Sequence, residues 1–445
     1  MKRLGILLLV CGMARSLLAQ DPAPAPAVTP EAAPTPWNLH FQTTFVWQDK
    51  RPFEAAYTGT NSLVPQRETA YTLTATLFLG VRLWKGAELY LNPETIQSRP
   101  LSNLKGLGGL TNGENQKNGG PDIQLYRARL FLRQTFGLGG EKKAVEDGAN
   151  QLAGTVDSRR LVVSVGNLAV MDVFDVNGYA HDPRTGFFNW AFMTYGAYDY
   201  AADARGYSVG AAVEYFRDEW AFRVGRFAQP RESNGLYLDN QIFQHFGDQI
   251  EVEHGHALGN QPGKLRLLAF RNVASMGSFR EALEYAQVRG GTPALANVRR
   301  DQAKFGVGAA VEQNLIAGVG LFARWSWNDG KTETYAFTEI ERSLATGIVA
   351  KGTPWRRPDD SVGVAFVQNG LGGDHRQYLA AGGLGAFIGD GALSYAPERV
   401  WEAFYNAAGP TGMWLSGNVQ YVTNPAYNAV RGPVTVWGCR IHVDL

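Results

Sequence analysis

Cysteine, charge and long hydrophobic runs are all scarce in this sequence of 445 residues. It has two cysteines, Cys11 and Cys439, and Cys11 falls in an N-terminal segment with the features of an export signal. One remaining cysteine cannot form an internal disulfide, so an exported fold must close in another way. No apolar run of about 18 or more residues follows that segment, which excludes a bundle of membrane-spanning helices. Charged residues make up 19% and the formal net charge is +1, which gives no support to a nucleic-acid binder.

The N-terminal segment has the pattern of a secretory signal. Two basic residues, Lys2 and Arg3, precede the apolar run "LGILLLV", and Ala19 is a suitable residue before a cleavage point. We predict a signal peptide over residues 1–19, because this apolar run is too short for an uncleaved membrane anchor. Residues 20–36 are rich in proline and alanine, which favours extended polyproline II structure, and are predicted to form a periplasmic leader.

From residue 37 to 445, apolar and polar residues alternate in segments of roughly ten residues. In "YTLTATLFLGVRL" (71–83) every odd-numbered residue is apolar, and the even-numbered ones are threonine, glycine and arginine, interrupted by Phe78. Segments at 207–215, 305–312 and 434–445 repeat the pattern, and turn-rich stretches separate them. Side chains alternate across a strand, so this predicts an all-β fold, a transmembrane antiparallel β-barrel with a water-filled lumen.

The alternative is a soluble β-sandwich or propeller, whose strands also alternate. The export signal and the near absence of cysteine favour the barrel instead. About 410 residues follow the leader. At about 9–11 residues for each spanning strand, they allow roughly 14–18 strands, an even number, around an aqueous lumen.

One segment, "LYRARLFLRQTFG" (125–137), carries three arginines. Arg127, Arg129 and Arg133 share one parity, and the other parity is nearly all apolar. A charge on the lipid face of a barrel costs about 2–4 kcal/mol at the bilayer midplane. We therefore predict that the arginine face borders the lumen.

The same parity argument yields a set of candidate pore-lining side chains. Guanidinium groups offer forked donors, carboxylates offer acceptors, and aromatic rings offer an apolar platform for a sugar face. A lumen lined by both positive and negative side chains suits neutral polar solutes better than it suits phosphate. For each arginine, a salt bridge that braces the inner wall is the alternative. The predicted pore-lining residues are Arg82, Arg127, Arg129, Arg133, Arg324, Glu88, Glu214, Glu312, Tyr90, Phe131 and Trp414.

Catalytic and metal-binding motifs are missing from the sequence. No HExxH, GxSxG or paired CxxC pattern occurs, and the Gly-Lys-Thr at 330–332 lacks the upstream glycine of a phosphate-binding loop. His254 and His256 share one strand face, which is too small a set for a metal site without further ligands. We predict no enzymatic activity, no cofactor and no metal site.

Several longer blocks resemble the carbohydrate-selective porins of the OprB type. The resemblance implies a 16-stranded outer-membrane barrel for the diffusion of sugars such as glucose. It also implies a constriction lined by arginines, acidic residues and aromatics. The blocks are "RLFLRQTFGLGGE" (129–141), "NQLAG" (150–154), "DVFDVNGYAHDPRTGFFNWAF" (172–192), "WRRPDDSVGVAFVQNGL" (355–371), "AAGGLGAFIGDGAL" (380–393) and "NPAYNAVRGPVTVWGCRIHVDL" (424–445).

Together these observations predict a passive porin for glucose-like sugars in the outer membrane of a Gram-negative bacterium. Its expected partners are small sugars as transported solutes and the outer-membrane lipid, with no nucleic acid. The sequence leaves monomer and homotrimer equally open. Two alternatives remain open: a porin for other small polar solutes such as organic acids, and an exported β-protein that binds sugars without transporting them.

Overall fold

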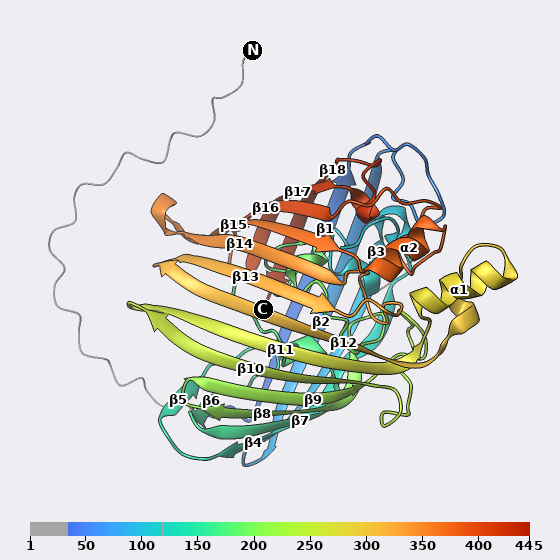
Figure 1. Ribbon diagram of the computed structural model, residues 1–445. Coiled ribbons are helices and arrows are strands. Elements are labelled where there is room, and N and C mark those ends of the chain that lie inside the picture. The colour runs from blue at the N-terminus through green and yellow to red at the C-terminus, as the bar shows by residue number, and fades with distance from the viewer. Residues whose placement is uncertain (1–33, 118–119) are drawn as a thin grey trace.

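The structure is a computed structural model that describes residues 34–117 and 120–445. The predicted signal peptide (1–19) and residues 20–33 of the predicted leader lie outside the described residues. Sixteen strands form one closed antiparallel barrel, in which each strand pairs with its neighbours along the chain and β1 closes against β18 (Figure 1). The prediction of an all-β barrel of about 16 strands is confirmed.

The strands of the barrel are β1 (Trp37–Lys50), β2 (Glu68–Trp84), β3 (Ala87–Arg99), β4 (Gln124–Gly137), β7 (Arg160–Leu168), β8 (Ser208–Arg217), β9 (Trp220–Ala228), β10 (Phe246–Leu258), β11 (Gln261–Met276), β12 (Arg300–Ile316), β13 (Val319–Asn328), β14 (Arg342–Gly352), β15 (Arg357–Gly370), β16 (Glu398–Ala408), β17 (Met413–Thr423) and β18 (Val434–Asp444). A separate hairpin consists of β5 (Lys142–Val145) and β6 (Gly154–Asp157). The helices are α1 (Phe279–Arg289) and α2 (Gly373–Ala380), with short 3-10 turns η1 (Leu101–Leu104), η2 (Asn115–Lys117), η3 (Val170–Asp172), η4 (Trp190–Phe192), η5 (Leu295–Val298), η6 (Thr353–Trp355) and η7 (Pro425–Tyr427). No helix in the described part of the chain is long and apolar enough to cross a membrane.

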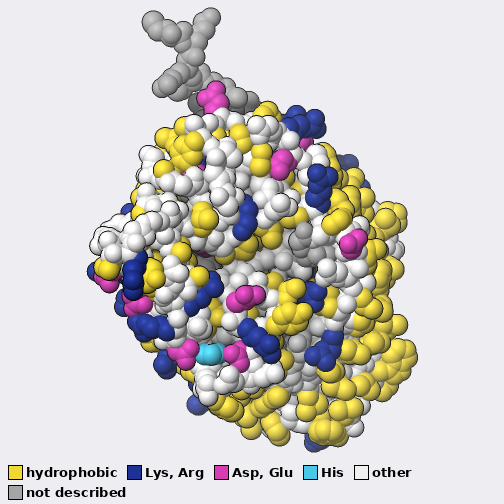
Figure 2. Space-filling model, turned by 90° about the vertical axis from the view of Figure 1, so that its right-hand side faces the viewer, with side chains coloured by type: hydrophobic (Ala, Val, Ile, Leu, Met, Phe, Trp, Pro, Cys, Tyr) yellow, Lys and Arg dark blue, Asp and Glu magenta, His cyan; other side chains and the backbone are white. Residues whose placement is uncertain are grey.

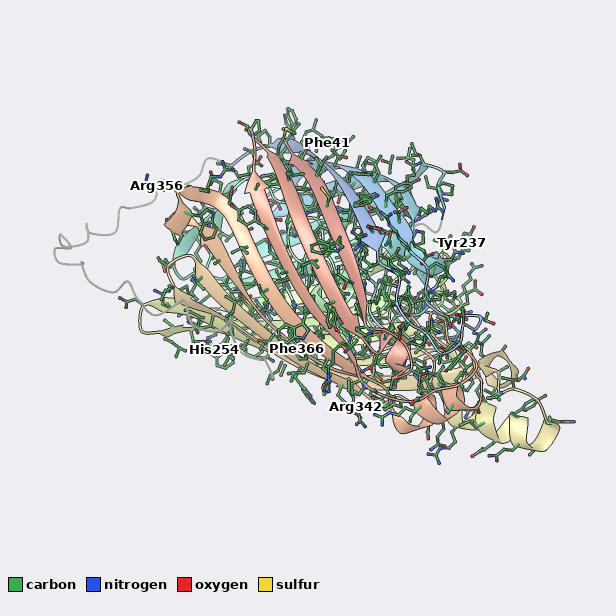
Figure 3. The ribbon with its side chains drawn as sticks, turned by 90° about the horizontal axis from the view of Figure 1, so that it is seen from above. Phe41, Tyr237, His254, Arg342, Arg356 and Phe366 are labelled. Carbon is green, nitrogen blue, oxygen red and sulfur yellow. The ribbon has the colours of Figure 1, made fainter. Side chains whose placement is uncertain are left out.

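The two ends of the barrel differ in their connections. Several hairpins close with short turns at one end, and the other end carries long connections with α1 and α2 (Figure 1). In Figure 3, Arg356 lies at the left with the short turns, and Tyr237 lies at the right with the long connections. Outer-membrane barrels place short turns in the periplasm and longer loops outside the cell. We call these ends the short-turn end and the long-loop end.

The alternation in the sequence corresponds to the two faces of the barrel wall, with apolar side chains on the outer face and polar side chains on the inner face. On β2, Leu77 is 40% exposed on the outer face, whereas Thr76 is 1% exposed on the inner face. On β18, Trp437 is 48% exposed and Arg440 only 1%. Figure 2 looks onto the long-loop end: charged side chains gather there, and hydrophobic side chains cover the flank at the right and below. The outer wall is therefore apolar and the inner wall polar.

The position of Arg127 corrects one sequence prediction. The pairing of β3 with β4 shifts between Asn92 and Pro93, which pair with Arg129 and Arg127, so Ala128 is an extra residue in β4. Proline has no N–H to give to the ladder, and bulges are where strands accommodate it. The bulge reverses the parity of the start of β4. Arg127 is exposed on the outer face, and the prediction that it lines the lumen was wrong.

The segment "KLRLLAFRNV" (264–273) also differs from its sequence prediction, because its strand is more regular than the sequence suggests. Its basic residues occur on both parities, which suggests a bulge, a short strand or a loop end at this position. The structure instead contains one continuous strand, β11, paired without a shift to both neighbours. Arg266 points inward and is buried, and Arg271 is exposed on the outer face.

Candidate solute pathway through the barrel

The connection between β7 and β8, residues 169–207, folds into the barrel and is called the inward segment here. Its aromatic residues Trp190, Phe192 and Tyr195 are at most 1% exposed. The Trp190 ring stacks on Tyr200 and on Phe337, with ring centroids 6.2 and 5.4 Å apart. These contacts pack the aromatic rings of the inward segment against one another and against Phe337 inside the barrel.

Carboxylates of the barrel wall hold the backbone of the inward segment. Its few regular elements, η3 and η4, leave many buried N–H groups that need partners. Glu251 accepts a hydrogen bond from the Asp175 N–H at 2.8 Å, and Glu312 accepts one from the Gly178 N–H at 2.8 Å. Farther round the wall, Glu402 accepts from the Asn189 N–H at 3.0 Å. Glu312, predicted to line the pore, therefore has a structural role in positioning this segment.

Arg324 has the same kind of role from β13. Its side chain is 2% exposed. The guanidinium forms an ion pair with Asp175 at 3.1 Å. It also donates to the carbonyls of Phe192 and Ala180 at 2.9 and 2.7 Å. Arg324 thus makes a structural salt bridge, as in the alternative for the lumen arginines, but it fastens the inward segment to the wall and does not brace the wall itself.

The sequence contains 52 glycines, and close contact between the wall and the inward segment explains some of them. A Cβ on Gly320 would lie 2.0 Å from the Tyr179 ring, and one on Gly308 would lie 2.8 Å from the Tyr195 ring. Both glycines lie on the inner face of their strands, where a side chain would displace these rings. Glycine is the residue that permits such close approach.

A first cavity of about 300 Å³ lies between the inward segment, residues 113–117 and the wall of β1, β2 and β4; we call it the inner cavity. Its charged groups are paired across the space. Arg129 makes a bidentate pair with Asp172 at 2.6 and 2.7 Å. Arg184 bonds Glu94 at 2.9 Å and Glu114 at 2.8 Å. The cavity therefore presents both signs of charge beside the rings of Trp190, Tyr200 and Tyr207.

Burial and neighbouring charges set the protonation of groups in the inward segment. Burial alone would raise the pKa of Asp172, but the charge and hydrogen bonds of Arg129 outweigh it and hold that pKa below its usual value. Burial lowers the pKa of His181, so this imidazole is neutral at pH 7. Its Nδ1 atom is buried without a hydrogen-bond partner among the described residues. His181 also lines the inner cavity.

A second cavity of about 510 Å³ opens at the short-turn end; we call it the mouth cavity. Arg82 and Glu88 form an ion pair there at 3.3 Å. Arg133 lies over the rings of Tyr90 and Phe131, at 5.1 and 5.4 Å from their centroids. Its guanidinium also donates to the Asn150 carbonyl at 2.9 Å. Asn150 lines the inner cavity and the next residue, Gln151, lines the mouth cavity, so this stretch of chain borders both cavities.

The predicted residues therefore fall into distinct places. Arg82, Arg133, Glu88 and Glu214 line the mouth cavity, and Arg129 lines the inner cavity. Tyr90 and Phe131 face inward but are covered, with 0% and 2% of their surface exposed. Trp414 lines a separate cavity of about 250 Å³ with Arg440 and His442. Arg324 and Glu312 hold the inward segment, and Arg127 lies outside. A role of these groups in solute passage stays a prediction.

Sequence reasoning missed several charged groups of the inner cavity. Lys117, Asp172 and Arg184 lie in connections, where strand parity gives no direction. Glu94 shares the inward parity of Glu88 on β3, a signal that was present in the sequence. Tyr207 has the outward parity of its segment, but β8 begins only at Ser208 and the tyrosine lies inside.

No group of three or more metal-ligating side chains occurs within residues 34–117 and 120–445. A family model described as carbohydrate-selective porin, OprB family, matches residues 60–445. The structure of Pseudomonas putida OprB at high pH is similar, with a TM-score of 0.69 and 17% sequence identity over 92% of this chain and 94% of that chain. The outer-membrane channel DcaP of Acinetobacter baumannii has a TM-score of 0.52 and 8% identity over 92% and 97% of the chains. The comparison with curated proteins found no match.

Proposed function

The chain belongs to the OprB family of carbohydrate-selective porins, and from this premise we propose that sugars pass through its inner cavity and then its mouth cavity. The family places the protein in the outer membrane of a Gram-negative bacterium, as a diffusion channel for carbohydrates. The members of this family are channels and not a class of enzyme, and we propose that this chain acts without catalysis or cofactor.

The observation that supports this path is the pairing of opposite charges along it. Arg129 with Asp172 and Arg184 with Glu114 offer donors and acceptors within the same narrow space. A neutral polyol can exchange its water hydrogen bonds for these groups and lay its apolar face on a ring. An anion would meet Asp172 and Glu114 as well as the arginines, so no strong anion preference follows.

We propose that the narrowest point lies where one stretch of chain borders both cavities. There, Arg133 bridges the rings of Tyr90 and Phe131 to the Asn150 carbonyl. A solute that leaves the inner cavity must pass this guanidinium. A homotrimer remains one proposed assembly, and light scattering of the purified protein in detergent would distinguish it from a monomer.

The proposal predicts that liposomes containing the protein swell faster in glucose than in gluconate. The two solutes have the same number of carbons, but gluconate carries a charge and must give up strong hydration to enter a space whose own charges are already paired. Swelling rates from light scattering give the comparison, with protein-free liposomes as the control. Faster entry of gluconate would favour the alternative of an organic-acid porin, and no entry of either solute would contradict the proposed path.

A further inference from the structure

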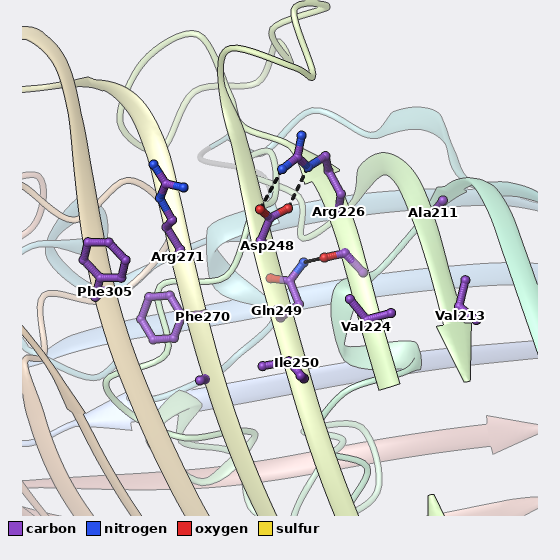
Figure 4. Close-up of a pocket in the computed structure, with 12 residues that line it drawn as sticks. Ala211, Val213, Val224, Arg226, Asp248, Gln249, Ile250, Phe270, Arg271 and Phe305 are labelled. Atoms are coloured by element: carbon purple, nitrogen blue, oxygen red, sulfur yellow. Dashed lines mark hydrogen bonds and ion pairs between the residues drawn. The ribbon is translucent and has the colours of Figure 1, made fainter. Parts of the chain in front are cut away.

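A hollow of about 610 Å³ lies on the outer face of the barrel, across β8 to β12 and away from the lumen (Figure 4). Its floor is a row of outward side chains that the strand register places side by side: Val213 pairs with Val224, Val224 with Ile250, and Ile250 with Ala269. The small Ala269 sits beside Leu267, which is 65% exposed and stands out from the wall. The result is an apolar groove in a surface that faces lipid.

A row of charged side chains borders this groove on the side of the long-loop end. The register places Asp248 between Arg226 and Arg271. Arg226 and Asp248 form a bidentate pair with both distances at 2.7 Å. In Figure 4 the guanidinium groups of Arg226 and Arg271 both point up, away from Ile250 and Val224. The groove thus has an apolar floor and an ionic border along the side nearer the long-loop end.

Arg271 carries the uncompensated charge of this row. It has no ion pair with any residue in the described ranges, and its guanidinium lies 5.8 Å from the ring centroids of Phe246 and Phe305. The Arg226–Asp248 pair is neutral, so the row has a net charge of about +1 at neutral pH. An arginine on the lipid face costs about 2–4 kcal/mol at the midplane and about 0–1 near the interface. Such a group is stabilised where an anion of the headgroup layer reaches it.

We propose that this groove binds one phosphate-bearing acyl lipid from the leaflet at the long-loop end. The phosphate lies on the forked donors of Arg271, the neighbouring Asp248 carboxylate being neutralised by its pair with Arg226, and an acyl chain lies along Val213, Val224, Ile250 and Ala269. Arginine matches phosphate geometry through two parallel hydrogen bonds, and the rings of Phe246 and Phe305 hold the guanidinium in place. The apolar row supplies the contact that a headgroup alone would lack.

Charge argues against a second copy of the chain as the occupant. In a two-fold contact the same patch meets itself, so Arg271 would face another copy of this basic row. The one carboxylate of the row, Asp248, is already bonded through both oxygens to Arg226. Like charges facing each other across an interface are unfavourable. A lipid phosphate provides the missing anion without this cost.

The test measures binding of two probes to the folded protein in detergent by native mass spectrometry. The probes are dimyristoyl phosphatidic acid and dimyristoylglycerol, which share acyl chains and differ in the phosphate. We expect one tightly bound phosphatidic acid per chain, and a loss of about tenfold or more in affinity in Arg271→Ala, because charge-assisted hydrogen bonds are lost. Ala269→Trp should fill the groove and weaken binding to a similar degree.

The control is Arg342→Ala, which removes an exposed arginine on the outer face of β14 and should bind the lipid like the original chain. Heat-dependent gel mobility confirms that each variant folds, and glucose swelling should be unchanged because Arg271 lies outside the lumen. Equal binding of the two probes, or full binding by Arg271→Ala and Ala269→Trp, would overturn the proposal. So would a dimer that Ala269→Trp dissociates, because it would identify a second copy as the occupant.

Discussion

Replacing Arg324 by methionine should loosen the inward segment and raise the single-channel conductance. The substitution leaves the Asp175 carboxylate buried, with hydrogen bonds from Thr194 and the Tyr195 N–H but without its cation. Breaking one side of a buried ion pair typically costs about 3–5 kcal/mol. The inward segment should therefore leave its position and widen the lumen. Planar-bilayer recordings measure the conductance, and thermal unfolding in detergent measures the stability.

Two further variants make this result specific. Adding Asp175→Asn to Arg324→Met removes the unpaired charge and should restore part of the stability, since the two sites are directly coupled. Arg342→Ala on the adjacent strand β14 removes an exposed arginine and should change the stability by less than about 0.5 kcal/mol. Conductance and stability both unchanged in Arg324→Met would show that Arg324 does not hold the segment.

Replacing Arg129 and Arg133 together by glutamine should shift the ion preference of the pore toward cations. The change removes two positive charges from the proposed path and leaves the carboxylates of Asp172, Glu114 and Glu88 in place. Because the potential along the path becomes more negative, the cation-to-anion permeability ratio should rise by about two- to tenfold. The reversal potential in a potassium chloride gradient gives this ratio.

Arg127→Gln is the matched control for this selectivity test. It removes the same charge from the same strand, two residues from Arg129, but on the outer face. Its reversal potential should equal that of the original chain. A shift as large as in the double variant would mean that the bulge at Ala128 does not turn Arg127 outward. No shift in the double variant would place the narrowest point away from both arginines.

The barrel wall could be predicted from the sequence because the same physical constraint acts on every spanning residue. Outward side chains meet an apolar medium and inward ones meet water or the inward segment, so alternation recurs along each strand. The errors came from single residues. Pro93 cannot donate to the ladder, and the bulge opposite it reversed the parity of Arg127. Arg271 breaks the alternation of β11 without breaking the strand, because its charge lies toward one end of the barrel.

The interior of the lumen could be predicted only in part. Parity placed Arg129 and Arg133 inside, but it could not show which arginines were free and which were fastened to the inward segment. Those contacts join residues far apart in sequence, such as Arg184 with Glu94 and Arg324 with Asp175. Their partners lie in irregular backbone whose path depends on the whole barrel. The sequence blocks that resemble the porin family contain Asp172 and Arg184, but the sequence of a block does not show which side chains its residues contact.

The most direct test of the sugar pathway is a single-channel recording of the purified protein in a planar bilayer, with glucose added stepwise to one side. We expect discrete openings of a water-filled pore, with a current that falls reversibly as glucose occupies the inner cavity. Openings whose current does not respond to any concentration of glucose beyond the change in bulk conductivity would contradict it.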